Sequence, residues 1–158
     1  MINTRFNPPA NDRYFEDYAP DSVYEFGSVR VEEEEMLAFA RRYDPQSYHV
    51  DREAAGKSVF GGLIASGWFT AALAMRLLVD HFVSRVASLG SPSAGEVHWL
   101  KPVRAGDELV LRVEIRETRR SESKPDRGIV RAFVEVLNQD RDVVMTRWAI
   151  GFVRCRTA

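Results

Sequence analysis

Three stretches in the last third of the chain alternate between apolar and polar residues, and this period constrains the fold more than any other feature. They are residues 109–115, 130–136 and 144–152. Side chains on a strand point to opposite faces in turn, so each stretch predicts a strand with one apolar face. The short link at 138–141 predicts an antiparallel hairpin, whereas 118–128 predicts a longer polar connection. Residues 97–103 predict one further strand.

An uncharged segment precedes these strands. No residue from Ser58 to Met75 is charged, but the segment holds three glycines, and Arg76 and Asp80 follow at once. A lipid-facing helix would be richer in leucine, isoleucine and valine, so we expect no membrane span here. The pattern predicts a loop and then a helix over 67–85. Because its apolar residues surround most of the axis, this helix is expected to be central and nearly engulfed.

The first half of the chain predicts a strand over 23–29 and a second helix. Four glutamates after Val31 suit a helix N-terminus, an apolar stripe at spacings of three and four follows, and Pro45 ends the helix. Residues 1–22 are expected to lie extended over the body, with aromatic side chains as anchors. Residues 23–158 then form a single α+β domain, in which an antiparallel sheet packs on one hydrophobic helix.

Charge and cysteine content exclude several classes of protein. The chain has 22 Lys and Arg against 23 Asp and Glu, a net charge of −1, so nothing points to nucleic acid as a partner. Cys155 is the only cysteine, which excludes an intramolecular disulfide and a multi-cysteine zinc site. The three histidines show no metal-ligand spacing, so no metal site is predicted. The N-terminal residues are charged where a secretory signal would be apolar, so we expect a cytoplasmic location.

The densest polar cluster lies at 43–51. Asp44 and His49 are five residues apart with Pro45 between them, so their side chains can converge in a loop that leaves a helix. A carboxylate and an imidazole that hold one water suit general acid–base chemistry. A purely structural interpretation is also open, in which Asp44 caps a turn and Asp51 caps the helical residues that follow.

A second candidate is the glycine-rich segment 60–67, just before the long helix. Glycines allow close backbone approach, and the first N–H groups of a helix have no partner within it. These N–H groups can stabilise a carbonyl oxygen that gains negative charge during a reaction. The alternative is a plain loop, in which Ser66 caps the helix and the glycines serve tight packing.

Together these residues resemble the MaoC-like dehydratase family, which has the hotdog fold and includes the (R)-specific enoyl-CoA hydratases. The resemblance rests on 43–51, on 60–68 and on 100–107. It implies a long central helix wrapped by an antiparallel sheet. It also implies that Asp44 and His49 are the catalytic pair.

The same resemblance implies that the amide of Gly67 binds the thioester oxygen. Ser66, Gln46 and Gly62 are predicted to be substrate-binding residues beside it. Gln46 stands where the family usually has asparagine, and Phe69 stands where relatives with a similar stretch often have histidine. These departures leave the Asp44–His49 pair intact and put the natural substrate in doubt.

The function that follows is that of a hydro-lyase, which adds water reversibly to a 2-enoyl thioester, most simply an acyl-CoA, without a metal or redox cofactor. An acyl-CoA thioesterase is the alternative enzyme, because fold does not fix function. It needs a carboxylate on the long helix, where only Asp80 is available. A non-catalytic acyl-CoA-binding protein is the third interpretation. A single sheet around one helix exposes edge strands, which predicts a homodimer or an assembly of dimers.

Overall fold

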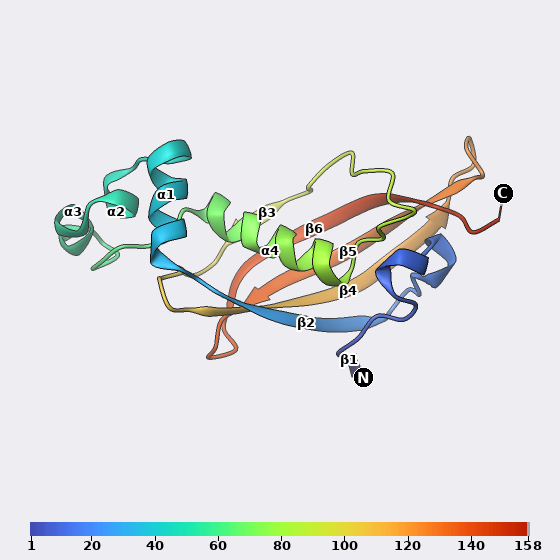
Figure 1. Cartoon of the computed structure of the whole chain (residues 1–158), viewed down its shortest axis with the longest axis horizontal. Coiled ribbons are helices and arrows are strands. Elements are labelled where there is room, and N and C mark those ends of the chain that lie inside the picture. The colour runs from blue at the N-terminus through green and yellow to red at the C-terminus, as the bar shows by residue number, and fades with distance from the viewer. Residues whose placement is uncertain (158) are drawn as a thin grey trace.

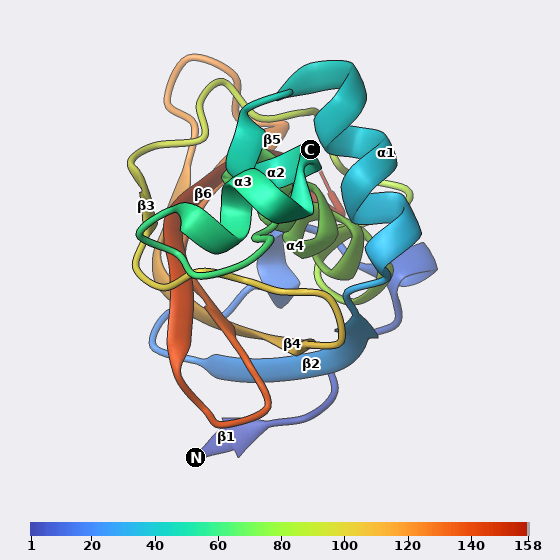
Figure 2. The same ribbon diagram turned by 90° about the vertical axis from the view of Figure 1, so that its left-hand side faces the viewer.

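One sheet wraps around a long helix in the computed structural model, which describes residues 1–157 (Figures 1 and 2). The helix is α4 (Gly67–His81), and the strand order is β1-β2-β4-β5-β6-β3. The strands are β1 (Ile2–Asn3), β2 (Val23–Arg30), β3 (Val97–Trp99), β4 (Glu108–Arg120), β5 (Arg127–Leu137) and β6 (Val143–Arg154). All neighbours pair antiparallel except β1 and β2. The predicted α+β architecture is confirmed.

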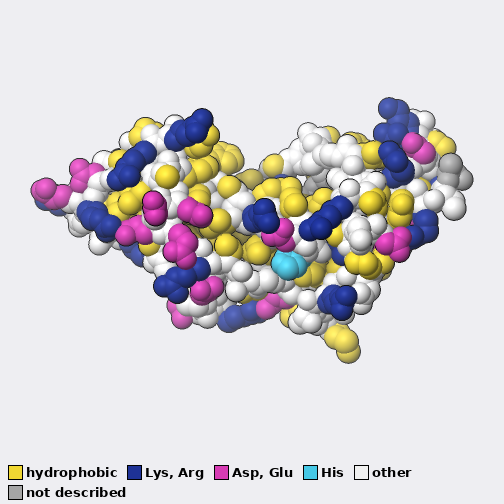
Figure 3. Space-filling model, in the orientation of Figure 1, with side chains coloured by type: hydrophobic (Ala, Val, Ile, Leu, Met, Phe, Trp, Pro, Cys, Tyr) yellow, Lys and Arg dark blue, Asp and Glu magenta, His cyan; other side chains and the backbone are white. Residues whose placement is uncertain are grey.

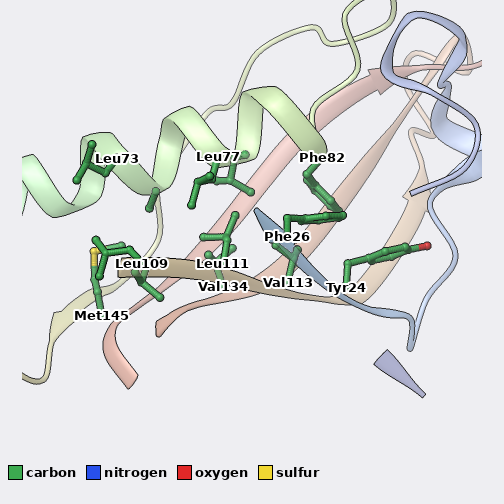
Figure 4. Close-up of a cluster of buried hydrophobic side chains, with 14 of the residues drawn as sticks. Tyr24, Phe26, Leu73, Leu77, Phe82, Leu109, Leu111, Val113, Val134 and Met145 are labelled. Atoms are coloured by element: carbon green, nitrogen blue, oxygen red, sulfur yellow. The ribbon is translucent and has the colours of Figure 1, made fainter. Parts of the chain in front are cut away.

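The two-residue alternation places the apolar side of each long strand against α4. The inward residues of β4 have no exposed surface, and Leu73 and Leu77 of α4 point toward them (Figure 4). These β4 residues are Leu109, Leu111, Val113 and Ile115. The expected hairpin at 138–141 forms, but the predicted long connection at 118–128 was wrong. β4 continues to Arg120 and β5 begins at Arg127, because Arg119 pairs with Ile129 and Arg120 pairs with Gly128.

The strand predicted over 97–103 is also shorter than expected. β3 ends at Trp99, because the N–H groups of Leu100 and Lys101 both reach the carbonyl oxygen of Val144 and the chain leaves the sheet edge. The helix predicted over 67–85 likewise ends early, at His81.

The prediction that α4 is nearly engulfed was wrong on one side. Trp68, Met75 and Val79 are 60%, 42% and 40% exposed, and Ala72 between them is exposed as well. These four residues, which we call the outer stripe, lie on the side of α4 that the sheet leaves partly uncovered, because a single curved sheet covers only part of a helix. No helix among residues 1–157 is long and apolar enough to cross a membrane.

Residues 1–22 hold two short 3₁₀ turns, η1 (Ala10–Asp12) and η2 (Phe15–Asp17), and cover the C-terminal end of α4. Phe6 and Tyr18 are buried there against Phe82. The buried Arg13 guanidinium donates to the carbonyl oxygens of His81 and Phe82, at 2.8 and 2.7 Å. These bonds satisfy carbonyl groups that the end of a helix leaves without partners.

Three helices gather at the opposite, N-terminal end of α4 (Figure 2). They are α1 (Glu33–Tyr43), α2 (Ser47–Val50) and α3 (Arg52–Lys57). The Asp51 carboxylate accepts hydrogen bonds from the N–H groups of Glu53 and Ala54, so Asp51 caps α3. The fold therefore brings the 43–51 cluster and the start of α4 to the same end of the molecule.

Candidate active site

Asp44 and His49 converge at the N-terminus of α4. Asp44 follows the last residue of α1, and His49 lies in the short helix α2. The Asp44 Oδ2 atom is 3.3 Å from His49 Nε2, and the two side chains are 18% and 6% exposed. Pro45 ends α1 and turns the chain, which allows side chains five residues apart to face each other.

The tautomer of His49 follows from its second partner. His49 Nδ1 is 2.8 Å from the carbonyl oxygen of Ile64, which can only accept a hydrogen bond. Nδ1 therefore carries a hydrogen, and the neutral tautomer that fits this bond has a lone pair on Nε2, which faces Asp44. A carboxylate and a lone pair that face each other can share a molecule with two O–H donors, such as water.

Two hydrogen-bond donors hold Asp44 in its ionised form. Ser66 Oγ donates to Oδ2 and Gln46 Nε2 donates to Oδ1, each at 2.7 Å. These bonds, that of Ser66 first, lower the pKa of the Asp44 carboxyl group. Ser66 Oγ also accepts from the N–H of Trp68 and so caps α4. The structural interpretation of Ser66 is thus correct, and the same hydroxyl contacts the predicted catalytic carboxylate.

Gly67 is the first residue of α4, and its N–H has no hydrogen-bond acceptor within residues 1–157. Its carbonyl oxygen accepts a 2.8 Å bond from Trp99 Nε1. A Cβ atom at this position would lie 2.5 Å from the Trp99 ring, so close packing with Trp99 requires glycine here. The free N–H remains available to an oxygen of a ligand.

These groups line one cavity of about 460 Å³. Of the six residues predicted for the site, Asp44, Gln46, His49 and Gly67 line it, and Ser66 lies behind Asp44. Gly62 is outside the lining, next to the Arg104 guanidinium. The remaining walls are mainly aromatic and apolar; they include Tyr48, Phe60, Ile64, Trp68, Trp99 and Leu100.

Three of the residues that shape the site were missed by the sequence reasoning. Trp99 lies just before the 100–107 stretch, and Tyr48 donates from its hydroxyl to Gln46 Oε1. Arg104 donates to the carbonyl oxygens of Phe60 and Leu63, at 2.5 and 3.1 Å, and so fixes the loop before Gly67. Arg104 is the only arginine in the 100–107 stretch, and this was the sequence feature that could have indicated its role.

Phe69 packs in the core against Phe39, with ring centroids 5.5 Å apart, and does not line the cavity. In the described part of the chain, no three His, Cys, Asp or Glu side chains form a group that could hold a metal ion.

A sheet wrapped around one long helix defines the hotdog fold, and here a carboxylate–imidazole pair lies at the start of that helix. Residues 16–136 match the model of the MaoC like domain. The chain therefore belongs to the MaoC-like family of hydratases and dehydratases.

Two solved structures and one further relative show how far this likeness extends. A MaoC-like dehydratase from Rhodospirillum rubrum is 41% identical, with a TM-score of 0.82 over 92% of this chain and 99% of that one. The R-hydratase PhaJ1 from Pseudomonas aeruginosa shares the fold at 21% identity, with a TM-score of 0.71 over 90% of this chain and 86% of that one. The uncharacterised protein YdeM of Bacillus subtilis is 28% identical over 78% of this chain and 86% of its own length.

Proposed function

We propose that this protein hydrates a 2-enoyl thioester, most simply an enoyl-CoA, to the 3-hydroxyacyl thioester, and catalyses the reverse dehydration. The observation that carries the proposal is the placement of Asp44, His49 and the free Gly67 N–H around one cavity. The solved relative described as an R-hydratase supports the same reaction class. The proposed chemistry uses no metal and no redox cofactor.

In the proposed mechanism one water donates its two O–H bonds to Asp44 and to His49 Nε2. The thioester oxygen accepts a hydrogen bond from the Gly67 N–H, so that negative charge can develop on it. As the water oxygen bonds to C3, the Asp44–His49 pair takes one proton and the C2–C3 double bond becomes an enolate. The pair then returns that proton to C2, which completes the addition of one water.

The thioesterase alternative lacks a carboxylate in the right place. Asp80 is thirteen residues after Gly67 on α4, which places it roughly 20 Å away along the helix axis. Its carboxylate already pairs with Arg76 at 2.8 Å. It is thus remote from the free N–H that would hold the thioester oxygen.

The decisive assay follows a panel of 2-enoyl-CoAs of different chain lengths by enoyl absorbance and by release of free thiol. We expect the enoyl absorbance to disappear without thiol release. Thiol release would instead support the thioesterase, and binding without any conversion would support the non-catalytic protein.

Removing the Ser66 hydroxyl should change the pH dependence of this activity. Ser66 lowers the pKa of Asp44, so Ser66→Ala raises that pKa, and the acidic limb of the kcat/KM profile should move to higher pH. Gln46→Leu should move the limb in the same direction without affecting the cap of α4. A limb that stays in place in both variants, with only a lower melting temperature for Ser66→Ala, would reduce Ser66 to a helix cap.

We also propose that two copies pair along β3 and the outer stripe of α4. Trp68 of the stripe contacts Trp99 of the edge strand β3, with ring centroids 5.0 Å apart, so the two exposed features are continuous. Hydrophobic side chains also line the saddle-shaped hollow in the middle of the surface in Figure 3. Because Trp68 and Trp99 line the cavity as well, the partner copy would cover its mouth.

A charge on the outer stripe should separate the copies. We expect light scattering to give twice the mass of one chain for the unaltered protein and the mass of one chain for Val79→Asp, because pairing would bury the new carboxylate. Ser123→Asp adds the same charge to the exposed β4–β5 loop and should leave the mass unchanged. A single-chain mass for the unaltered protein at micromolar concentration would exclude the dimer.

A further inference from the structure

One arginine interrupts the apolar inner face of the sheet. Arg147 of β6 is paired with Val134 of β5 and with Val97 of β3. Residues paired across antiparallel strands point to the same face, and Val134 is fully buried in the core. Met145, two residues earlier on the same face, is also fully buried. The Arg147 side chain therefore enters the space between the sheet and α4.

Within residues 1–157, the Arg147 guanidinium has no acidic partner. Its Nε donates to the carbonyl oxygen of Trp148 at 3.3 Å, and it forms no ion pair within residues 1–157. Arg112 and Arg131, both on the outer face of the sheet, instead pair with glutamates. Burial alone lowers the pKa of Arg147, yet a guanidinium remains charged in proteins. A half-buried charge without a counter-ion is unfavourable, so this position is suited to an anion from elsewhere.

Arg147 lines a second cavity, of about 170 Å³. Its walls are largely apolar and include Met75 and Leu78 of α4 and Ala149 and Val153 of β6. An apolar cavity of about 150 Å³ can hold a benzene molecule, so this one has room for the tail of a short acyl group. It combines largely apolar walls with one guanidinium group, and together these suit a carboxylate at the end of a hydrocarbon chain.

The second cavity lies on the same side of α4 as the candidate active site. Trp99, which contacts Gly67, is paired with Met145, and Arg147 follows two residues later. Strand geometry puts the Cα atoms of Trp99 and Arg147 about 8 Å apart. Along α4, Thr70 lines the first cavity and Met75 lines the second, and this separation of five residues spans about 7.5 Å of helix.

We propose that Arg147 binds a carboxylate at the far end of the acyl group, so that the preferred substrate is the monothioester of a short unsaturated dicarboxylic acid. This inference rests on the proposed hydration of 2-enoyl thioesters and names the substrate class. In this arrangement the thioester oxygen binds at Gly67, the reacting carbons lie beside Asp44 and His49, and the far carboxylate reaches the guanidinium of Arg147. A neutral alkyl tail would leave that charge without a partner.

A binding measurement tests the carboxylate site without any turnover. Adipoyl-CoA and hexanoyl-CoA have acyl chains of equal length, and only the first ends in a carboxylate. We expect calorimetry to show that adipoyl-CoA binds about 10- to 100-fold more tightly, the usual range for a hydrogen-bonded charged group. Arg147→Leu should abolish this difference, and Arg147→Lys should retain part of it. Arg131→Leu removes an arginine from the opposite face of the sheet and should leave the difference unchanged.

Turnover then separates this inference from the proposed reaction. 2-Hexenedioyl-CoA should be hydrated with a higher kcat/KM than 2-hexenoyl-CoA, and Arg147→Leu should reverse the preference. Tighter binding of adipoyl-CoA without hydration of either enoyl ester would support the carboxylate site and reject the hydratase. Equal affinity for the two saturated esters would overturn the inference. So would an Arg147→Leu variant that keeps the preference and loses only the dimer, because Arg147 would then serve the subunit interface.

Discussion

Asp44→Asn is expected to lower kcat by about 10²- to 10⁴-fold, the range for loss of a general acid or base. The carboxylate accepts from Ser66 and Gln46 and faces His49 Nε2, so it is positioned to take a proton from a water held between the two side chains. The carboxamide keeps the size of the side chain and loses its basicity. The measurement is the initial rate of loss of enoyl absorbance at saturating substrate.

His49 requires a more careful choice of variant. Its Nδ1–H satisfies the buried carbonyl oxygen of Ile64, so His49→Ala would leave that oxygen without a partner and lower stability as well as activity. His49→Gln offers an amide N–H in place of Nδ1–H and is the matched control for folding. We expect a similar loss of kcat in both His49 variants, and a clear drop in melting temperature only for His49→Ala.

The double variant tests whether the two residues act as a unit. If they hold and deprotonate the same water, Asp44→Asn combined with His49→Gln should lose about as much activity as either change alone. Losses that multiply would assign the residues to separate steps. Near-normal turnover by a folded Asp44→Asn protein would return the cluster to the structural interpretation, in which Asp44 only caps a turn.

The strands and the Asp44–His49 pair could be predicted because both depend on local sequence. Alternation over 109–115 fixes which side chains of β4 lie on its apolar face, and this does not depend on the rest of the sequence. Pro45 between Asp44 and His49 ends one helix and turns the chain within six residues. Each inference needs only backbone geometry and a short stretch of sequence.

The parts that could not be predicted depend on contacts between distant segments. Trp99 and Gly67 are 32 residues apart, and nothing near either one indicates that an indole ring covers the glycine. Arg147 lies in the 144–152 stretch, whose alternation predicts a strand. One charged residue on the apolar side of such a strand does not by itself indicate a binding site. The pattern of apolar residues could not predict that Met75 and Val79 are exposed. Apolar residues on a helix give the same pattern whether a sheet or a second copy of the chain covers them.

Gly67→Pro tests the oxyanion donor, and the structure shows how to make that test specific. Proline lacks the N–H but suits the first position of a helix, and the extended backbone of Ser66 (ψ 136°) is compatible with a following proline. However, any Cβ at this position would lie 2.5 Å from the Trp99 ring. Both Gly67→Pro and Gly67→Ala therefore displace Trp99, and neither single variant isolates the N–H.

Trp99→Ala removes the obstructing ring and provides the background for the comparison. In that background Gly67→Ala keeps the N–H and Gly67→Pro removes it, while both add the same Cβ. We expect kcat for the proline variant to be about 10²- to 10³-fold below that of the alanine variant, the loss for one oxyanion donor. Affinity for a saturated acyl-CoA should differ little, because the bond strengthens only as charge develops on the thioester oxygen. Equal turnover of the two folded variants would remove Gly67 from the mechanism, and the enolate oxygen would then require another donor at the start of α4.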